Sequence, residues 1–398
     1  MPDHNSPTWS YSLPAALLLM APFDILASLA MDIYLPVVPE MPGILGTSPA
    51  IVQLTLSLYM LLLGVGQILV GPLSDRFGRR PVLLGGATLF ALSSLGLAAT
   101  SSAPAFVALR LVQAAGASAA LVATFATVRD VYGARPEGVT IYGLFSAMLS
   151  FVPALGPIAG ALIAGTFGWR AIFLTLGVLG LAALGQALLR WSETRPAQSS
   201  NVMPSFAPVL RSGAFWTYTL GFSTAMGAFF VFFSTAPRLL IDRAGYSQFG
   251  FSLAFATAAV VMIITTRFAK GFVERYGIPG CLARGMGLIM LGGLLLAVGE
   301  VLATPSFVSF VLPMWVIAVG IVMSASVSAN GALKAFDAVA GTAVALYFCV
   351  QSLIVGLVGT GAVLLLRGDT AWPLVGYCLV MATITQFAMA CLNRRERH

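Results

Sequence analysis

Two aspartates stand in an otherwise apolar run, LLLMAPFDILASLAMDIYLPVVP, which covers residues 17–39. An ionised carboxylate at the centre of a bilayer costs roughly 2.5–3.5 kcal/mol even on the most lenient scale. Asp24 lies about eleven residues into the apolar stretch that begins at Leu13, close to mid-membrane. Asp32 lies near its far end, before Pro36, where capping the helix end is the alternative to a functional role. These positions favour carboxyl groups that bind and release a proton.

A single arginine, Arg110, also falls inside an apolar run. On a helix, the eight residues from Asp24 to Asp32 give roughly 12 Å of rise and about 80° of rotation, so both carboxyls can face one cavity at different depths. Arg110 enters its run by about six residues, roughly 9 Å, which places it in depth between the two acids and nearer Asp32. Its guanidinium keeps its proton, while burial and a nearby cation shift the pKa of a carboxyl in opposite directions. The three side chains therefore predict an acid whose proton affinity changes with its surroundings.

The composition is that of a membrane protein. Of 398 residues, 59% are hydrophobic and 9% are charged, whereas soluble domains usually carry about 25% charged residues. The net charge of +7 comes from residues scattered over short loops, which membrane topology explains without nucleic-acid binding. No Lys or Arg precedes the first apolar run and no small-residue cleavage site follows it, so we expect this run to be a true span.

Several kinds of chemistry are excluded by residue types. The two histidines, His4 and His398, stand at the ends, which excludes histidine catalysis, zinc sites and a histidine proton relay in the membrane. The two lysines, Lys270 and Lys334, lack the flanking Gly and Ser or Thr of a P-loop, so no nucleotide-driven pump of that type is expected. No cofactor is expected, and the ion that the buried acids are expected to bind is a proton. The cysteines lack metal-ligand spacing and are expected to be buried hydrophobic residues; they are Cys281, Cys349, Cys378 and Cys391.

Twelve windows of about 20 mainly apolar residues are long enough to cross a bilayer as helices. They cover residues 13–35, 51–72, 82–101, 104–127, 138–164, 169–190, 214–237, 248–270, 280–302, 307–331, 338–366 and 371–392. Of the 21 Lys and Arg residues, sixteen lie in loops on the side that holds both termini and four on the other side, with Arg110 inside a span. This excess predicts that both termini lie in the cytoplasm.

The chain divides into two halves of six spans. The longest polar connection is Ser192–Ser212, which predicts an N-terminal bundle over 1–192, a cytoplasmic linker over 193–212 and a C-terminal bundle over 213–398. An acid–Arg–aromatic–Gly run follows the second span as Asp75–Gly78 and the eighth as Glu274–Gly277, an offset of 199 residues. Two six-span repeats around a central site are the plan of a secondary transporter.

Two motifs resemble those of the major facilitator superfamily. GPLSDRFGRR, at Gly71–Arg80, is similar to the family's loop motif between the second and third spans. LRLVQAAGAS, at Leu109–Ser118, resembles its fourth-span motif, with Ala114 where the family often has Gly; the motif positions are Arg110, Gln113 and Gly116. The resemblance implies an all-α polytopic membrane protein with twelve transmembrane helices in two pseudo-symmetric six-helix bundles.

A third motif, ALGPIAGAL at Ala154–Leu162, resembles the fifth-span motif of the family's antiporters, with Ala161 in place of its last Gly. Small residues at Gly156 and Gly160 permit close helix packing, and Pro157 removes a backbone donor and permits a kink. The predicted role is a tight, bent helix that seals the centre against proton leak. Packing alone is the alternative.

The loop motif is expected to act as a cytoplasmic latch. By resemblance, Asp75 contacts helix ends of the other half, and Arg79 is predicted to pair with Asp130 at the end of the fourth span. Such ion pairs contribute little singly, but they can bias two conformations that lie within a few kcal/mol of each other. For Arg76 and Arg80 a solvated turn is the alternative. The residues assigned to gating are Gly71, Asp75, Arg76, Arg79, Asp130, Gly156, Pro157 and Gly160.

Other stretches resemble one branch of the superfamily. MDIYLPVVP, at Met31–Pro39, looks like the Bcr/CflA drug exporters. Together with LLLMAPFDILASLAMDIYLP, the stretches FATVRDVYG, FFVFFSTAP and DTAWP look closest to phenicol exporters, which expel chloramphenicol and florfenicol. The resemblance implies a drug:proton antiporter of the bacterial inner membrane that confers resistance. Its expected partners are the drug, protons and the bilayer, without nucleic acid or nucleotide, and a monomer suffices because one repeat pair can enclose the site.

Within this scheme Asp24 is the principal proton carrier, Asp32 is a second acid near the drug, and Arg110 tunes both electrostatically. No acid lies well inside a span of the C-terminal half, because Glu300 and Asp337 fall at span ends and are expected to be solvated. Proton coupling is therefore expected in the N-terminal half.

The drug pocket is expected to be aromatic and apolar with a few polar groups, since phenicols combine an aromatic ring with amide and hydroxyl groups. The candidates are Tyr34, Tyr59, Tyr142, Phe145, Met148, Phe229, Phe233, Asn330, Tyr347 and Gln351. For the aromatic candidates the alternative is lipid-facing or core packing, and for the two amides it is helix–helix hydrogen bonding.

Three other functions remain as alternatives. A broad multidrug:proton antiporter of the same branch would differ from a phenicol exporter in only a few pocket side chains. A proton-coupled importer has the same fold, but the antiporter motif argues against it. A membrane enzyme would need a nucleophile–base pair or a metal cluster, and the sequence presents neither.

Overall fold

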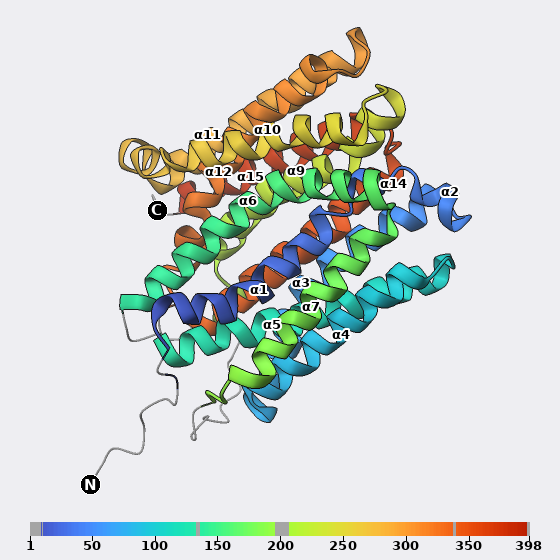
Figure 1. Cartoon of the computed structure of the whole chain (residues 1–398). Coiled ribbons are helices and arrows are strands. Elements are labelled where there is room, and N and C mark those ends of the chain that lie inside the picture. Colours follow the sequence, from blue (N-terminus) through green and yellow to red (C-terminus); the bar gives the residue numbers. More distant parts are fainter. Residues whose placement is uncertain (1–8, 10, 133–135, 196–206, 337–339, 396–398) are drawn as a thin grey trace. The chain divides into compact units, whose positions relative to one another are not determined.

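The chain is all-helical in the computed structural model, which describes residues 9, 11–132, 136–195, 207–336 and 340–395 (Figure 1). No strand occurs among these residues. The elements, with η for 3₁₀ or π turns, are α1 (Leu13–Asp32), η1 (Leu35–Val37), α2 (Met41–Leu45), α3 (Pro49–Phe77), α4 (Arg79–Ala99), α5 (Ala103–Tyr132), α6 (Pro136–Phe167), α7 (Arg170–Arg190), α8 (Ala207–Leu210), α9 (Gly213–Pro237), η2 (Arg238–Arg243), α10 (Gln248–Thr266), α11 (Ala269–Leu302), η3 (Phe307–Val311), α12 (Leu312–Leu333), α13 (Ala340–Ile354), η5 (Val355–Gly359), α14 (Thr360–Leu365) and α15 (Trp372–Arg395).

Eleven helical stretches of the described part are long and apolar enough to cross a membrane. The remaining predicted span corresponds to α6, a helix of 32 residues whose segment Phe151–Phe167 is apolar. Helices suit this environment because each satisfies its own backbone hydrogen bonds where no water is available. The all-α, multi-span architecture expected from hydropathy is confirmed.

Residue contacts divide the chain into two units. The first comprises Met1–Tyr34, Gly43–Thr47 and Leu58–Val202, and the second comprises Leu35–Pro42, Ser48–Ser57 and Met203–His398. The short stretches around η1 and the start of α3 therefore group with the C-terminal helices, although they belong to the first half of the sequence. The functional division into halves stays a prediction.

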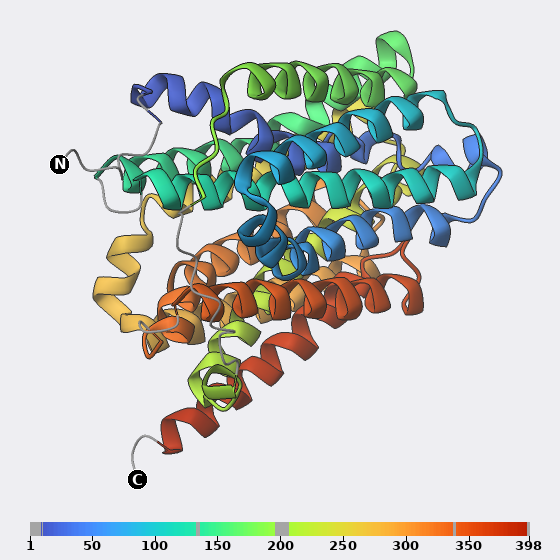
Figure 2. The same ribbon diagram turned by 90° about the horizontal axis from the view of Figure 1, so that it is seen from below.

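In the first unit, α4 packs along α5 and α7, and α1 packs against α5, α6 and α7 (Figures 1 and 2). The crossing of α4 and α5 is close because glycines meet there. A Cβ on Gly86 would lie 2.7 Å from the carbonyl oxygen of Gly116, and one on Gly116 would lie 2.6 Å from that of Gly86. The two backbones are therefore in direct contact, as small residues permit between membrane helices.

The second unit repeats this crossing between α11 and α12, which pack along each other. A Cβ on Gly285 would lie 2.8 Å from the carbonyl oxygen of Gly320, and one on Gly320 would lie 2.6 Å from that of Gly285. Gly285 follows Gly86 by the same 199 residues that separate the two acid–Arg–aromatic–Gly runs. The internal repeat seen in the sequence thus extends to helix packing.

The two runs also end in the same backbone conformation. Gly78 has φ of 104° and Gly277 has φ of 66°, in the region where a side chain is strained and glycine is not. Gly78 separates α3 from α4, and Gly277 interrupts α11 with non-helical dihedral angles.

Two expectations about individual side chains are wrong. Cys391 on α15 is exposed, whereas the other three cysteines are buried; a lipid-facing surface is as apolar as a helix interface, so composition does not separate them. Glu300 at the end of α11 is not solvated, because its side chain is 7% exposed and pairs with Arg243 at 2.5 Å. Asp337 lies outside the described residues.

Candidate functional site

Arg110 lies on α5 and is buried, with 1% of its surface exposed. Its Nη1 donates hydrogen bonds to the carbonyl oxygen of Ala30 at 3.1 Å and to Oε1 of Gln113 at 2.6 Å. Gln113 Nε2 donates in turn to Oγ of Ser94 on α4 at 2.8 Å. The two motif residues Arg110 and Gln113, one turn apart, thereby tie α5 to α1 and to α4.

Two tyrosine rings lie against the Arg110 guanidinium. Its central carbon is 5.2 Å from the ring centroid of Tyr34 and 4.6 Å from that of Tyr59, within the ~6 Å range of a cation–π interaction. The Tyr59 hydroxyl donates to the carbonyl oxygen of Ala27 at 2.8 Å, which holds the ring in place. The structure therefore brings Tyr34 and Tyr59, both drug-contact candidates, to the Arg110 cluster.

The Arg110 contact falls at the C-terminal end of α1. Because α1 ends at Asp32, carbonyl groups of its last turn have no N–H partner within the helix. Arg110 donates a hydrogen bond to the carbonyl oxygen of Ala30, and the backbone N–H of Ile33 donates to the carbonyl oxygen of Leu29 at 2.9 Å. A cation is favourable there because the helix macrodipole leaves a partial negative charge at the C-terminus. Nε and Nη2 of Arg110 have no hydrogen-bond partner among the described groups, so the helix end and the rings balance its charge.

Asp24 and Asp32 are both buried, at 1% and 6% exposure. Oδ2 of Asp24 has no hydrogen-bond partner in the described part of the chain. Asp32 is the last residue of α1, and its burial argues against a water-exposed interfacial cap. Tyr59 lies within electrostatic reach of both Asp32 and Arg110. The structure thus groups Asp32, Tyr59 and Arg110, while Asp24 lies two turns earlier on the same helix.

Gly156 and Gly160 lie where α6 packs on the end of α1. A Cβ on Gly156 would lie 2.8 Å from Cβ of Asp32, and one on Gly160 would overlap the carbonyl oxygen of Ile33. Pro157 stands between them inside α6. The close packing expected of the antiporter motif is confirmed, and it falls beside the buried acid Asp32. The sealing role of this contact stays a prediction.

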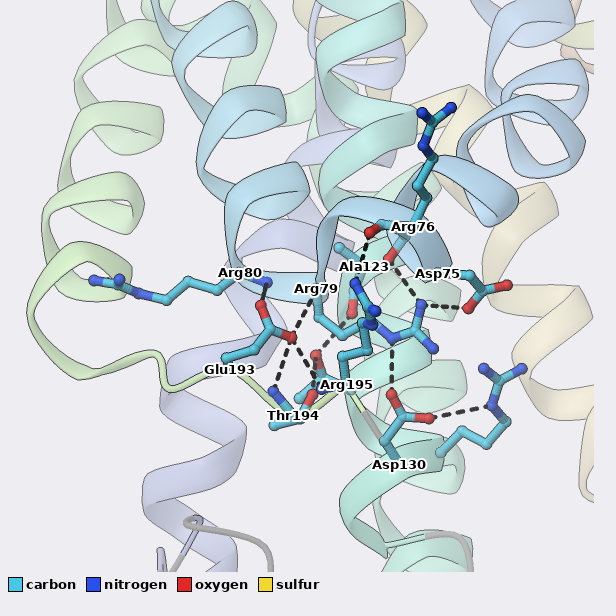
Figure 3. A network of polar contacts seen from close by, with 12 residues as sticks. Asp75, Arg76, Arg79, Arg80, Ala123, Asp130, Glu193, Thr194 and Arg195 are labelled. Atoms are coloured by element: carbon cyan, nitrogen blue, oxygen red, sulfur yellow. Dashed lines mark hydrogen bonds and ion pairs between the residues drawn. The ribbon is translucent and has the colours of Figure 1, made fainter. Parts of the chain in front are cut away.

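Arg79 is the centre of a polar network at the start of α4 (Figure 3). Its Nε lies 2.8 Å from Oδ2 of Asp130, and its Nη1 lies 2.5 Å from Oδ1 of Asp75. Nη1 also donates to Oγ of Ser74 at 3.2 Å. The ion pair predicted between Arg79 and Asp130 is confirmed. One buried guanidinium therefore joins the end of α3 to the end of α5.

Glu193 lies just after α7 and caps the same corner (Figure 3). Its carboxylate accepts hydrogen bonds from the backbone N–H groups of Arg79 at 2.8 Å and Arg80 at 3.1 Å, which have no partner within α4. The residue before α4 is Gly78, which has no side chain to cap the helix, and a Cβ there would overlap the Glu193 carboxylate. The acid also suits the positive end of the helix macrodipole.

Arg195 contacts the end of α3, the helix that precedes α4. Its Nη1 donates to the carbonyl oxygen of Arg76 at 2.6 Å, in the last turn of α3. Sequence reasoning assigned Glu193 and Arg195 only to the linker, because their partners lie 114 and 119 positions away. One feature of the sequence could have indicated the contact. Gly78, directly before α4, has no side chain to cap the helix, and the acid Glu193 at the start of the linker can do so instead.

The environment of Glu193 shifts its pKa. Partial burial by itself would raise the pKa of this carboxyl, but backbone N–H donors of Arg195, Arg79, Arg80 and Thr194 outweigh burial and hold the pKa below its ordinary value.

The other gating candidates, Gly71, Arg76 and Arg80, form no side-chain ion pair among the described residues. A Cβ on Gly71 would meet open space. Arg76 takes part in the network through its backbone carbonyl, while Arg80 donates from Nη2 to the carbonyl oxygen of Leu188 at 3.0 Å.

Two further drug-contact candidates of the first unit lie on α6. Phe145 is buried and packs edge-on against Phe125, with 5.8 Å between ring centroids. Met148 is half-buried. The side chain of Tyr142 lies outside the described residues.

In the second unit, Phe229 and Phe233 on α9 pack against Phe255 on α10, at centroid distances of 6.1 and 6.2 Å. These rings form part of an aromatic core. Asn330 is exposed near the C-terminal end of α12, so it does not join them.

Tyr347 and Gln351 lie one turn apart on α13 and are both buried. The ring of Tyr347 stacks on Phe222 at 5.1 Å, and its hydroxyl has no hydrogen-bond partner in the described part of the chain. Gln351 Oε1 accepts from Ser352 Oγ at 3.3 Å. This pair combines an aromatic face with polar groups, the chemistry expected of a phenicol contact.

The chain belongs to the Major Facilitator Superfamily, whose family profile matches residues 23–360. It is 50% identical over 389 residues to a chloramphenicol resistance protein of Pseudomonas aeruginosa, covering 97% of this chain and 92% of that protein. It is 26% identical over 412 residues to a bicyclomycin resistance protein homolog of Haemophilus influenzae, covering 99% and 100% of the two chains. The multidrug resistance protein MdtM of Salmonella typhimurium is 32% identical over 303 residues, covering 71% and 70%.

A solved structure supports the fold alone. The crystal structure of a D-xylose-proton symporter matches with a TM-score of 0.74 at 17% identity, covering 94% of this chain and 97% of that one. The resemblance to drug exporters that the sequence motifs indicated is confirmed by the relatives. The chain is therefore a multi-pass membrane protein of a transporter family.

Proposed function

We propose that this chain exports phenicol antibiotics from the bacterial cytoplasm by proton-driven antiport. The observation that carries the proposal is the 50% identity to the chloramphenicol resistance protein, which extends over 97% of the chain. The chain is then a transporter and not an enzyme. It resides in the inner membrane with both termini in the cytoplasm, as the loop charges favour. It acts as a monomer on the drug and protons.

The proton is carried by Asp24, with Asp32 as a second acid near the drug. Both are buried on α1, where an ionised carboxylate is costly unless water or a cation reaches it. A change of access from one face of the membrane to the other therefore changes the proton occupancy of each acid. Protons enter from the acidic periplasm and leave to the cytoplasm.

Arg110 supplies the fixed charge in this scheme. Its hydrogen bonds to Gln113 and to the end of α1 hold the guanidinium beside Tyr59, which also lies near Asp32. A movement of α1 relative to α5 would change the distance from Asp32 to this charge. The proton affinity of the acid would then follow the conformation of the helices.

Drug and proton binding exclude each other, so proton entry drives drug exit. For the drug we propose contacts with Tyr347, whose ring stacks on Phe222, and with Gln351, which is buried one turn further along α13. The remaining aromatic candidates are assigned to the pocket by residue type. The latch at Arg79, with Asp75 and Asp130, is proposed to bias the two access states.

The test uses everted vesicles with an acidic interior and a pH-sensitive dye. Adding florfenicol or chloramphenicol is expected to release protons from vesicles that contain the wild type. The release is expected to vanish in Asp24→Asn and Arg110→Ala. Asp369→Asn, an exposed acid with 43% of its side chain accessible, serves as the matched control and should keep full release.

Two results would change the proposal. If the wild type releases no protons while its vesicles acidify normally, phenicol antiport is wrong. If Asp32→Asn abolishes release and Asp24→Asn stays fully active, Asp32 is the principal carrier.

A second candidate is broad multidrug antiport, which the similarity to multidrug resistance proteins favours. A panel of chemically unrelated drugs in the same vesicles separates the two. Proton release by phenicols alone supports the narrow function, and release by several classes supports the broad one.

A further inference from the structure

A cavity of about 120 Å³ lies in the second unit. It is bounded by the η1–α2 connection, the first turn of α3 and the turn η2 after α9. All lining residues belong to this one unit; they are Val38, Pro39, Pro42, Pro49, Val52, Gln53, Arg238 and Asp242.

The cavity has hydrogen-bonding groups of both kinds. Gln53 is 5% exposed, and its Nε2 has no partner among the described groups. A buried polar atom without a partner is costly and uncommon, so this amide is suited to a ligand atom. Arg238 and Asp242 stand one turn apart on η2 and add donors and an acceptor.

A second carboxylate, Glu40, lies near the acidic side of the cavity. Asp242 lies within electrostatic reach of Arg238 and of Glu40, and Glu40 Oε1 accepts a hydrogen bond from Gln248 Nε2 at 2.7 Å. Arg238 forms no ion pair with a described residue, so its guanidinium donors remain available.

The apolar side is rigid. Three prolines and two valines form it, and proline fixes the backbone at φ near −65°. A wall that does not rearrange reduces the free energy lost on binding a small molecule.

Two stretches that carry the resemblance to drug exporters end at this cavity or directly before one of its lining residues. MDIYLPVVP contributes Val38 and Pro39, and FFVFFSTAP ends at Pro237, directly before Arg238. None of Val38, Pro39 and Arg238 is assigned to proton coupling.

We propose that this cavity is a release-side subsite that binds the amide and hydroxyl end of a phenicol. Gln53 and Arg238 donate to the acceptor oxygens of the drug, and Asp242 accepts from its hydroxyl groups. A volume of about 120 Å³ is below the ~300–1,000 Å³ of a pocket that encloses a drug-sized ligand, so only this end of the molecule enters. The assignment rests on the proposed function, which sets the ligand class and the periplasmic side.

The experiment tests whether florfenicol covers the cavity. A cysteine at Pro49→Cys reports on its wall, and Ala50→Cys, at the adjacent exposed residue that does not line it, is the control. Both are made with Cys391→Ser, since Cys391 is the exposed native thiol. Intact cells receive a membrane-impermeant thiol reagent, and the rate of labelling is measured with and without florfenicol. Proton release is measured in vesicles from the same strains.

Florfenicol is expected to slow labelling at Pro49→Cys and to leave Ala50→Cys unchanged. Adding Gln53→Leu or Arg238→Gln should raise the florfenicol concentration for half-protection about tenfold, as expected for a lost hydrogen bond to a buried or charged group. Arg367→Gln, an arginine with 81% of its side chain exposed, should leave it unchanged.

The outcomes separate this proposal from the proposed function. Drug-triggered proton release without protection, or protection that Gln53→Leu and Arg238→Gln do not weaken, overturns the subsite and leaves export standing. Absence of both release and protection overturns export, and the ligand assigned to the cavity with it. Protection without release supports the subsite and contradicts antiport.

Discussion

Arg110 is a buried cation held mainly by neutral groups. A carbonyl, an amide and two tyrosine rings contact its guanidinium, and no described carboxylate lies in an ion pair with it. A carboxylate in direct contact would keep its negative charge in every conformation. Neutral partners leave the charge of Arg110 free to act on Asp32 when the distance between them changes.

Tyr59 is predicted to matter through its ring more than through its hydroxyl. Tyr59→Phe removes the hydrogen bond to Ala27, a net loss of about 0.5–1.5 kcal/mol. Tyr59→Leu also removes the ring from Arg110, with a desolvated cation–π contact of about 2 kcal/mol. Thermal unfolding of purified protein should show a small decrease in Tm for the first variant and a larger one for the second. Proton release in vesicles should survive only Tyr59→Phe, and equal losses in both variants would contradict this role for the ring.

The Glu193 carboxylate is predicted to stabilise the folded protein by an amount that depends on pH. Its pKa in the folded protein lies below the ordinary value, so the contribution is present above the pKa of the unfolded chain and is lost as the pH falls through the folded pKa. The difference in Tm between the wild type and Glu193→Gln should therefore be large at neutral pH and shrink in acid. Glu274→Gln, at an acid whose side chain is 66% exposed, should differ little from the wild type. A difference that stays constant with pH would argue against a charged cap.

At the scale of helices, the contact of α6 with α1 predicts that alanine substitution has very different effects on stability at two glycines of α6. A Cβ at Gly160 would overlap the carbonyl oxygen of Ile33, whereas one at Gly165 would meet open space. Gly160→Ala should lower stability by about 1–3 kcal/mol through overpacking, and Gly165→Ala should be neutral or stabilising by up to about 1 kcal/mol. Tm reports the first effect. Decay of an imposed pH gradient without drug reports a leak, which is expected only for Gly160→Ala.

The helices were largely predictable, and their side-chain partners were not. Hydropathy identifies spans because a membrane helix must be long and apolar, and the Arg79–Asp130 pair followed from motifs at two span ends. The caps made by Glu193 and Arg195 depend on chain segments more than a hundred positions apart. Glu300 was expected in water because it ends a span, yet Arg243 meets it there. Position along a helix does not determine what packs against it.

At the scale of the whole molecule, two similar repeats differ in charge. Arg110 and Gln113 precede the crossing glycine Gly116 on α5 by six and three residues. The same positions before Gly320 on α12 are Met314 and Ile317, both buried. The repeats therefore share a packing scaffold, and only the first carries a cation at this level. This asymmetry favours the proposal that the first half carries the proton.

The shared scaffold predicts matched effects in both repeats. Gly86→Ala and Gly285→Ala each place a Cβ against the backbone of the partner helix, α5 or α12, and each should cost about 1–3 kcal/mol. Gly85→Ala and Gly287→Ala are the controls, because a Cβ at either position meets nothing within 4 Å, and alanine favours the helix by up to about 1 kcal/mol. Thermal unfolding of the four variants is the measurement. If only one of the two crossings is sensitive, the repeats differ in packing as well as in charge, and the scaffold is not shared.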